Sequence, residues 1–387
     1  MENFNSTAQN KDAAQFYSVH TFEIFMLLSK EEYIRCKGAL YDFCHTHGLS
    51  CYKHSSTTDS YKIFKWEGFT LLHTWRFIST GGCQYGMNII INARKLLGYT
   101  KHANICIAPA KDMSRIIPAI HERLNLIGLH FLDYNRFRLK RLDLCTNIRL
   151  ETPAVFEEYL RLICKGKNIY DSALLLCYDQ KQKRRIAPKT SFTLTGATFE
   201  ISLYAKQLQM LASKNHYPAE ELQAAENQLR IELRFTNQKN NELIQLYRNL
   251  DNLICHIPEI GHKYITQYLN AIYGEGDFIR FDIAAQQIED SRFHTTTKQK
   301  MRKFMKAIAK SSLSDAINKF GTDLSDSMMS HFNQLNISPI TLPIRSNYTL
   351  LRHPLRYIES QNVNHYDQDT QSAMGNGNIT QQMIGAD

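Results

Sequence analysis

The sequence predicts an α+β fold: an antiparallel sheet with helices on one face, followed by a helical C-terminal region. Three observations predict it. Apolar and polar residues alternate with a period of two in several segments before residue 240. The order β-α-β-β occurs twice, at about 20–92 and 136–206, as a candidate structural duplication. From about residue 241 to Gln334 the pattern becomes helical.

The first unit begins with a strand, because Thr21–Leu28 alternates between apolar and polar residues. Ser29 followed by Glu32 forms a capping box, which predicts a helix from there to about His47, ending at Gly48. Three more strands and a second helix are expected after it. The strands are Tyr61–Trp66, Thr70–Phe77 and Tyr85–Asn92, and the helix is Asp112–Leu126.

The second unit repeats this order. Arg136–Arg149 is predicted as a strand, and Thr152–Cys164 as a helix with Pro153 in its first turn. Further strands and two short helices follow. The strands are Ala173–Tyr178, Ser191–Thr195, Thr198–Lys206 and Gln228–Asn237, and the helices are Gln207–Lys214 and Ala219–Asn227.

Length and composition suggest how these elements are organised. At about 150 residues per domain, 387 residues predict two or three domains. We expect a flexible leader at 1–15, an α+β domain at 16–240 and a helical region at 241–344. The segment 345–387 is rich in Asn, Gln and Ser, and we expect it to end in a disordered tail from about Asn362.

The charge balance limits the partners. Lys and Arg number 46 against 37 Asp and Glu, a net charge of +9. Such a chain is either a binder of polyanions, such as nucleic acid or an acidic membrane surface, or a basic but ordinary enzyme. No signal peptide is recognisable and no apolar run approaches the length of a membrane span. The nine cysteines form no C-x-x-C pair, which predicts reduced thiols in a cytoplasmic protein.

Three predicted strands share one chemical pattern. In each, apolar side chains occupy one face and polar side chains the other, so the three polar faces should line one side of the sheet. A solvated sheet surface would show the same alternation. The polar positions are Arg141, Asp143, Cys145 and Asn147; Glu200, Ser202, Tyr204 and Lys206; and Arg230, Glu232 and Arg234.

This polar face suits the cleavage of a phosphodiester by a tyrosine. A phenol is a poor nucleophile until its proton is removed, and Lys206 would favour the phenolate of Tyr204. Asp143 and Glu232 offer hard oxygen ligands for Mg²⁺ or Mn²⁺, which would polarise the phosphate. The arginines on this face either hold phosphates or pair with the two acids. They are Arg141, Arg230 and Arg234.

The same residues carry a resemblance to a known family. Arg141-Leu142-Asp143, Tyr204-Ala205-Lys206 and Arg230-Ile231-Glu232-Leu233-Arg234 stand in order, preceded by the segment Ile91–Gly98. In these signals, over about residues 85–240, the chain resembles the phage and plasmid replication proteins of the gene II/X family. The type member of that family is the gene II initiator of filamentous phages, a nicking and closing enzyme.

The resemblance implies a rolling-circle replication initiator with domain 16–240 as its endonuclease. Tyr204 would form the 5′-phosphotyrosine link, and Asp143 and Glu232 would surround a divalent metal. Gln209 stands where family members often have a carboxylate, so a third metal ligand stays open, with Glu200 as a candidate substitute. The implied partners are origin DNA and a host helicase and polymerase in the bacterial cytoplasm, without a membrane or small-molecule cofactor.

Two basic runs are candidate DNA contacts. One lies in a predicted loop before the Tyr204 strand, and the other on a predicted helix of the region 241–344. Each phosphate contact would add to the salt dependence of binding. Both runs can equally be solvated surface. The residues predicted to contact phosphate are Lys181, Lys183, Arg184 and Arg185 in the loop and Lys300 and Lys303 on the helix.

Two other functions fit the sequence. One is a sequence-specific DNA-binding replication regulator without cleavage, built on a nuclease scaffold whose activity is lost. The other is an RNA-binding host factor, which rests on the positive charge alone.

Overall fold

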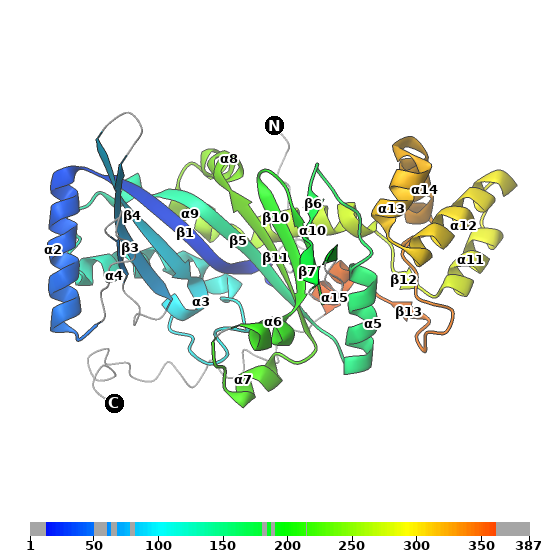
Figure 1. Ribbon diagram of the computed structural model, residues 1–387, viewed down its shortest axis with the longest axis horizontal. Coiled ribbons are helices and arrows are strands. Elements are labelled where there is room, and N and C mark those ends of the chain that lie inside the picture. The colour runs from blue at the N-terminus through cyan, green and yellow to red at the C-terminus, as the bar shows by residue number, and fades with distance from the viewer. Residues whose placement is uncertain are drawn as a thin grey trace.

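The computed structural model describes residues 13–49, 60–62, 68–77, 82–179, 184–186, 190–213 and 215–360. It confirms the α+β class, with one large antiparallel sheet and a helical C-terminal region (Figure 1). The sheet has nine strands in the order β2-β3-β4-β1-β5-β11-β10-β9-β6. The predicted leader up to residue 12 and the predicted tail from Asn362 lie outside the described residues.

The first half of the sheet contains the predicted first strand, the helix and the later strands, although residues 63–66 of the predicted strand Tyr61–Trp66 lie outside the described residues. The capping box at Ser29 is present, because its side chain accepts from the Glu32 amide and the Glu32 carboxylate accepts from the Ser29 amide. Strand β1 pairs with β4, the last strand of the unit, and β4 pairs with β3. The elements are β1 (Ser18–Leu28), α2 (Lys30–Thr46), β2 (Ser60–Lys62), β3 (Phe69–Phe77) and β4 (Cys83–Asn92).

The second half repeats that connectivity. Strand β5 pairs with β11, which lies beyond the predicted second unit at 136–206, and β11 pairs with β10, so the repeated connectivity extends to Thr236. Helix α5 starts as predicted, with Thr152 as its N-cap and Pro153 in the first turn. The elements are β5 (Arg138–Arg149), α5 (Pro153–Ile163), β6 (Ala173–Leu174), β9 (Ser191–Thr195), β10 (Phe199–Ala205) and β11 (Gln228–Thr236), with a separate pair β7 (Cys177–Asp179) and β8 (Arg184–Ile186).

The two halves meet in the middle of the sheet, where β1 pairs with β5. Phe22 lies opposite Leu142, and both side chains are fully buried on the helix-covered face. The connections between strands carry short helices. These are α3 (Ala93–Leu96), a 3-10 turn at Ala110–Arg115, α4 (Ile116–Leu126), a 3-10 turn at Tyr134–Arg136, α6 (Lys206–Ala212) and α7 (Ala219–Ala224).

Helices from the C-terminal part cover the apolar face of the sheet. Helix α10 packs on β1 and β5, and its Tyr264 and Tyr268 contact the ring of Phe235 edge to face. Gly261 allows the closest approach, since a Cβ atom there would lie 2.9 Å from Cβ of Tyr17. The helices of this layer are α8 (Asn237–Tyr247), α9 (Leu250–Cys255), α10 (Ile257–Tyr273) and α15 (Pro354–Ser360).

The remaining helices form a group at the end of the molecule opposite α2 (Figure 1). Helix α12 buries one apolar stripe that includes Phe304 and Ile308. Within the described parts of the chain, no helix has both the length and the apolar composition needed to cross a membrane. The group contains β12 (Phe278–Ile279), α11 (Phe281–Asp290), α12 (Thr295–Lys310), α13 (Leu313–Phe320), α14 (Thr322–Gln334) and β13 (Leu350–Leu351).

Candidate active site

The three strands with the shared polar pattern are neighbours in the sheet, in the order β5-β11-β10. Glu232 of β11 lies opposite Cys145 on one side and Ser202 on the other. Arg230 lies opposite Tyr204. Apolar residues at the alternate positions are buried on the helix-covered side. The prediction that the three polar faces line one side of an antiparallel sheet is therefore confirmed for the predicted positions that lie on the strands, which excludes Lys206.

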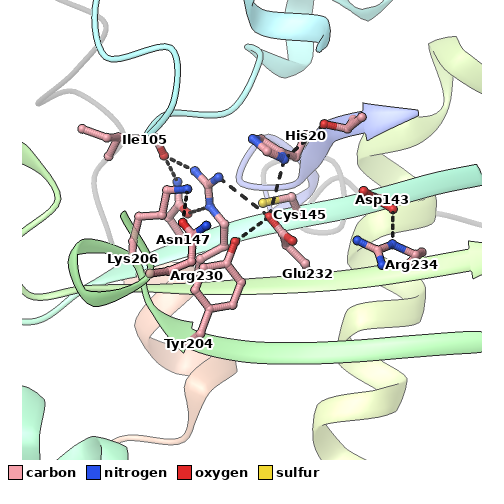
Figure 2. Close-up of polar contacts among 12 residues, drawn as sticks. His20, Ile105, Asp143, Cys145, Asn147, Tyr204, Lys206, Arg230, Glu232 and Arg234 are labelled. Atoms are coloured by element: carbon pink, nitrogen blue, oxygen red, sulfur yellow. Dashed lines mark hydrogen bonds and ion pairs between the residues drawn. The ribbon is translucent and has the colours of Figure 1, made fainter. Parts of the chain in front are cut away.

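Tyr204 is bonded to a carboxylate on the neighbouring strand. Its hydroxyl donates a hydrogen bond of 2.8 Å to Oε1 of Glu232, as Figure 2 shows. The two residues are diagonal neighbours across β10 and β11, a spacing that long side chains span readily. Both are partly buried. A tyrosine O–H directed at a carboxylate is the arrangement of a nucleophile next to a general base.

The environment of Tyr204 raises its pKa. Burial is the largest cause, the charge of Glu232 adds to it, and the charge of Arg230 opposes it. Lys206 was expected to favour the phenolate, but burial and the charge of Glu232 dominate the pKa of Tyr204 in this arrangement. The reason is that the phenol is removed from water and faces a negative carboxylate, both of which favour its protonated form. Tyr204 is a neutral donor in this arrangement.

Lys206 does not lie on the strand with Tyr204, contrary to the predicted strand Thr198–Lys206. Strand β10 ends at Ala205, and Lys206 is the first residue of α6. Its Nζ donates to Oε1 of Gln209 at 3.0 Å and lies 6.0 Å from the centre of the Tyr204 ring. Burial, with the charge of Arg230 next, lowers the pKa of Lys206 to about 8. The amine can therefore gain or lose a proton near neutral pH.

Arg230 is the most deeply buried charge of the site. Its Nε donates to Oδ1 of Asn147 at 2.9 Å, and its Nη2 donates to the carbonyl of Ile105. Its Nη1 lies 3.8 Å from Oε1 of Glu232. Ile105 belongs to the connection after α3, and its carbonyl also accepts from Gln228. This connection covers one end of the polar face, which is why Arg230 is fully buried.

Asp143 is held by two arginines. Nε of Arg141 donates to Oδ1 at 2.9 Å, and its Nη2 donates to Oδ2. Nε of Arg234 donates to Oδ1 at 2.9 Å, while its Nη1 pairs with Glu200 at 3.0 Å. The side chain of Asp143 is only 1% exposed. Of the two roles considered for these arginines, the structure shows pairing with acids.

The donor set around Tyr204 does not fit a resident Mg²⁺ or Mn²⁺. Such ions prefer several free oxygen ligands, whereas both carboxylate oxygens of Asp143 accept from guanidinium groups. Across the described residues, no three side chains of His, Cys, Asp or Glu come together as a metal site. Glu200, the candidate substitute ligand, pairs with Arg234. A metal requirement stays a prediction. The reaction steps proposed for Tyr204 use protein groups alone.

His20 is a site residue that the sequence reasoning missed. It belongs to β1, in the other half of the sheet, and its Nδ1 lies 3.5 Å from Oε1 of Glu232 (Figure 2). The register of β1 against β5 shifts between Val19 and Thr21, so His20 is an extra residue in the strand. Two successive polar residues, His20 and Thr21, interrupt the alternation there. That interruption was the available signal.

The basic residues predicted to contact DNA lie on other elements. Lys300 and Lys303 are exposed on α12, in the helical group at the end of the molecule. Arg184 and Arg185 belong to β8, which pairs with β7, so this part of the predicted loop is a strand. Lys181 and Lys183 lie outside the described residues. Of the four described residues, none is brought into the described contacts of Tyr204.

Comparison with known proteins adds little to this geometry. No family model matches the sequence, and no curated protein matches it. A rolling circle replication initiator from Geobacillus stearothermophilus is similar in structure over 80% of this chain and 96% of its own, with 8% identity and a TM-score of 0.30. DynU16, a putative protein of the dynemicin biosynthetic locus, covers 63% of this chain and 95% of its own, with 8% identity and a TM-score of 0.16. Neither likeness carries an argument about this chain.

Proposed function

We propose that this chain is a rolling-circle replication initiator that nicks one strand of origin DNA and later closes it through a 5′-phosphotyrosine. The observation that carries the proposal is the hydrogen bond of 2.8 Å from the Tyr204 hydroxyl to the Glu232 carboxylate. It supplies a nucleophile and a base in contact, on the polar face of a sheet whose buried side is rigidly packed. The order of motifs that resembles the gene II/X family supports the same reaction.

In the nicking step, Tyr204 attacks the phosphorus. Its proton passes to Glu232, the phenolate oxygen forms a bond to phosphorus, and the bond from phosphorus to the 3′ oxygen breaks. Once Glu232 is neutral, the opposing charge of Arg230 stabilises the phenolate, since Arg230 is the group that lowers the pKa of Tyr204. Until DNA is bound and the proton is transferred, Tyr204 stays a buried, neutral phenol, which is a poor nucleophile.

Lys206 is the candidate proton donor to the leaving group. The departing 3′ oxygen needs a proton, and an amine with a pKa of about 8 is protonated at pH 7 yet gives its proton up readily. In closure the roles reverse. The neutral amine takes the proton of the 3′ hydroxyl, the 3′ oxygen displaces the tyrosine, and the phenolate recovers its proton from Glu232. No external energy is needed, because the phosphotyrosine bond retains that of the broken phosphodiester.

The positive charge of the chain would attract DNA to the protein. The chain carries a net charge of +9, and exposed Lys300 and Lys303 on α12 offer a phosphate-binding surface outside the sheet. The host helicase and polymerase implied by the resemblance would act on the nicked product. Domain 16–240 would cut, and the region 241–344 would add DNA contacts.

The test is a nicking assay with an adduct search. Purified protein is incubated with supercoiled DNA carrying the noncoding region beside its own gene, with Mg²⁺, with Mn²⁺ and with EDTA. Wild-type protein is expected to give a nick and a nucleotide on Tyr204 by mass spectrometry. Tyr204→Phe is expected to lose both and to keep DNA affinity. The EDTA arm measures the metal requirement.

A non-catalytic regulator is the second candidate. It is favoured by the pairing of Asp143 with two arginines, an arrangement that leaves this acid no free oxygen. Specific binding to the noncoding region without a nick or adduct in any metal arm would establish that function and reject the nuclease. Nicking by Tyr204→Phe at the wild-type rate would reject Tyr204 as the nucleophile.

A further inference from the structure

His20 reaches the Tyr204 site because β1 contains a bulge. Val19 pairs with Leu144 and Thr21 pairs with Asp143, so two residues of β1 span one step of β5. Val19 and Phe22 are both fully buried on the helix-covered face. His20 and Thr21 are therefore both left on the polar side. A bulge that redirects a side chain in this way is typical beside active sites.

One carboxylate oxygen is the meeting point of three side chains. Oε1 of Glu232 accepts from Tyr204 at 2.8 Å, lies 3.5 Å from Nδ1 of His20 and lies 3.8 Å from Nη1 of Arg230. Figure 2 shows these groups converging on Glu232 from different elements. Arg230 Nη1 has no hydrogen-bond partner among the described residues. Of these three groups, the imidazole is second in distance from Oε1, after the tyrosine hydroxyl and before the guanidinium.

The imidazole is neutral in this position. Burial lowers the pKa of His20 well below its usual value, and the charges of Arg230 and Lys206 lower it further. Asp143 opposes this effect and Arg141 adds to it. A neutral ring brings no charge to Glu232, so it can direct the carboxylate without neutralising the base. The side chain of His20 is 22% exposed and that of Glu232 14%, so water competes little for this contact.

We propose that His20 is a positioning residue, whose Nδ1–H directs the Glu232 carboxylate at the Tyr204 hydroxyl, so that the first half of the sheet completes a site built on the second. The inference rests on the proposed nicking function. Thr21 Oγ1 is hydrogen-bonded to the same Nδ1 at 3.3 Å, so in this tautomer the proton on Nδ1 is shared between Thr21 Oγ1 and Glu232 Oε1 at 3.5 Å. The proposal requires the tautomer with its proton on Nδ1, which is the minor one for a free histidine.

Two isosteric variants separate a role of Nδ1 from a merely structural role. An asparagine at position 20 places its amide nitrogen where Nδ1 stands, whereas a glutamine places it near Nε2. His20→Ala and His20→Gln are expected to slow single-turnover adduct formation by about 10- to 100-fold, the cost of a misdirected catalytic group. His20→Asn is expected to stay within a few-fold of wild type. DNA affinity and melting temperature are expected to be equal in all of them, as in the control His130→Ala, a change at an exposed histidine.

The outcomes divide clearly. Equal rates for His20→Ala and wild type, or equal losses in the Asn and Gln variants, would overturn the positioning role while wild-type nicking stands. Recovery of His20→Ala by raised Mn²⁺ would overturn it in favour of a metal ligand. Absence of wild-type nicking on its own DNA would reject the nuclease and this inference together. ¹⁵N NMR of the imidazole, assigned with His20→Ala, should find the Nδ1–H tautomer, and a dominant Nε2–H form would contradict the proposal.

Discussion

The two halves of the sheet share one connectivity but carry different chemistry. In each half, a long central strand is followed by a helix and by strands that return to pair beside it. The second half presents Tyr204, Glu232 and Arg230 in direct or close contact. In the first half, the outward pairs of β1 and β4 include Phe25 with Asn88 and Leu27 with Gly86.

Part of the outer face of the first half is filled by packing. A Cβ atom at Gly86 of β4 would lie 2.6 Å from the Phe25 ring, so the ring lies directly over that glycine. The outer face of the second half is filled by ion pairs and hydrogen bonds. The comparison teaches that the repeated topology supplies a platform, and that a few outward residues decide whether a half carries chemistry. His20 is the first half's contribution to the other half's site.

The largest expected effect on the nicking rate comes from replacing a glutamate in each half of the sheet. Glu232→Gln keeps an oxygen that accepts from Tyr204 but cannot take up its proton, so nicking should fall about 10³-fold. Glu23→Gln is the matched change in the first half, where Glu23 pairs only with Lys140 at 2.7 Å among the described contacts. Its nicking rate should equal that of wild type. Single-turnover adduct formation measures both, and equal rates would remove Glu232 from the reaction.

The next effect concerns pH and distinguishes nicking from closing. Lys206, with its pKa near 8, is protonated below that pH and neutral above it. Nicking uses the ammonium form, so its rate should fall as pH rises through about 8. Closing uses the free amine, so its rate should rise over the same interval. The falling rate is measured by nicking as a function of pH. The rising rate is measured by joining a strand with a 3′ hydroxyl to the isolated adduct.

Lys206→Met provides the control for the pH dependence. The nicking and closing rates should both lose their dependence on pH near 8, and both should fall about 10²-fold, the ordinary contribution of a general acid or base. Parallel pH profiles for nicking and closing in wild-type protein would assign the proton transfer to another group.

The last expected effect is on stability and not on rate. Asp143→Asn replaces a carboxylate that is 1% exposed with a neutral amide, so Arg141 and Arg234 lose their charged partner. We expect a loss of about 2–4 kcal/mol in the free energy of unfolding. Glu23→Gln should cost less than about 1 kcal/mol, because Lys140 is half exposed. Urea denaturation measures both, and equal costs would contradict a structural role for the Asp143 cluster.

Much of the fold is local and was predictable. The capping box at Ser29, the Pro153 helix start and the alternation in β5, β10 and β11 are short-range patterns that fix caps and faces. Because side chains alternate across a strand, the sequence also placed Asp143, Tyr204 and Glu232 on the side away from the core. That their strands would be neighbours followed from the expectation of one antiparallel sheet.

The contacts within the site were not predictable in the same way. The pairing of Asp143 with two arginines depends on which residues of β5 and β11 lie opposite one another. The burial of Arg230 depends on a connection more than one hundred residues earlier, whose Ile105 carbonyl accepts a hydrogen bond from its guanidinium. The end of β10 at Ala205 depends on α6 packing beside β11, and it moves Lys206 off the strand face.

The sequence by itself therefore determined the class of fold, the outward chemistry of each strand and the candidate nucleophile, because periodicity and capping act over a few residues. Only the tertiary structure decided what each outward group does. Register, a bulge at His20 and the burial of Arg230 set which carboxylate accepts the Tyr204 hydrogen bond and which carboxylate is held by arginines. These are distances between segments far apart in the chain, and no local pattern encodes them.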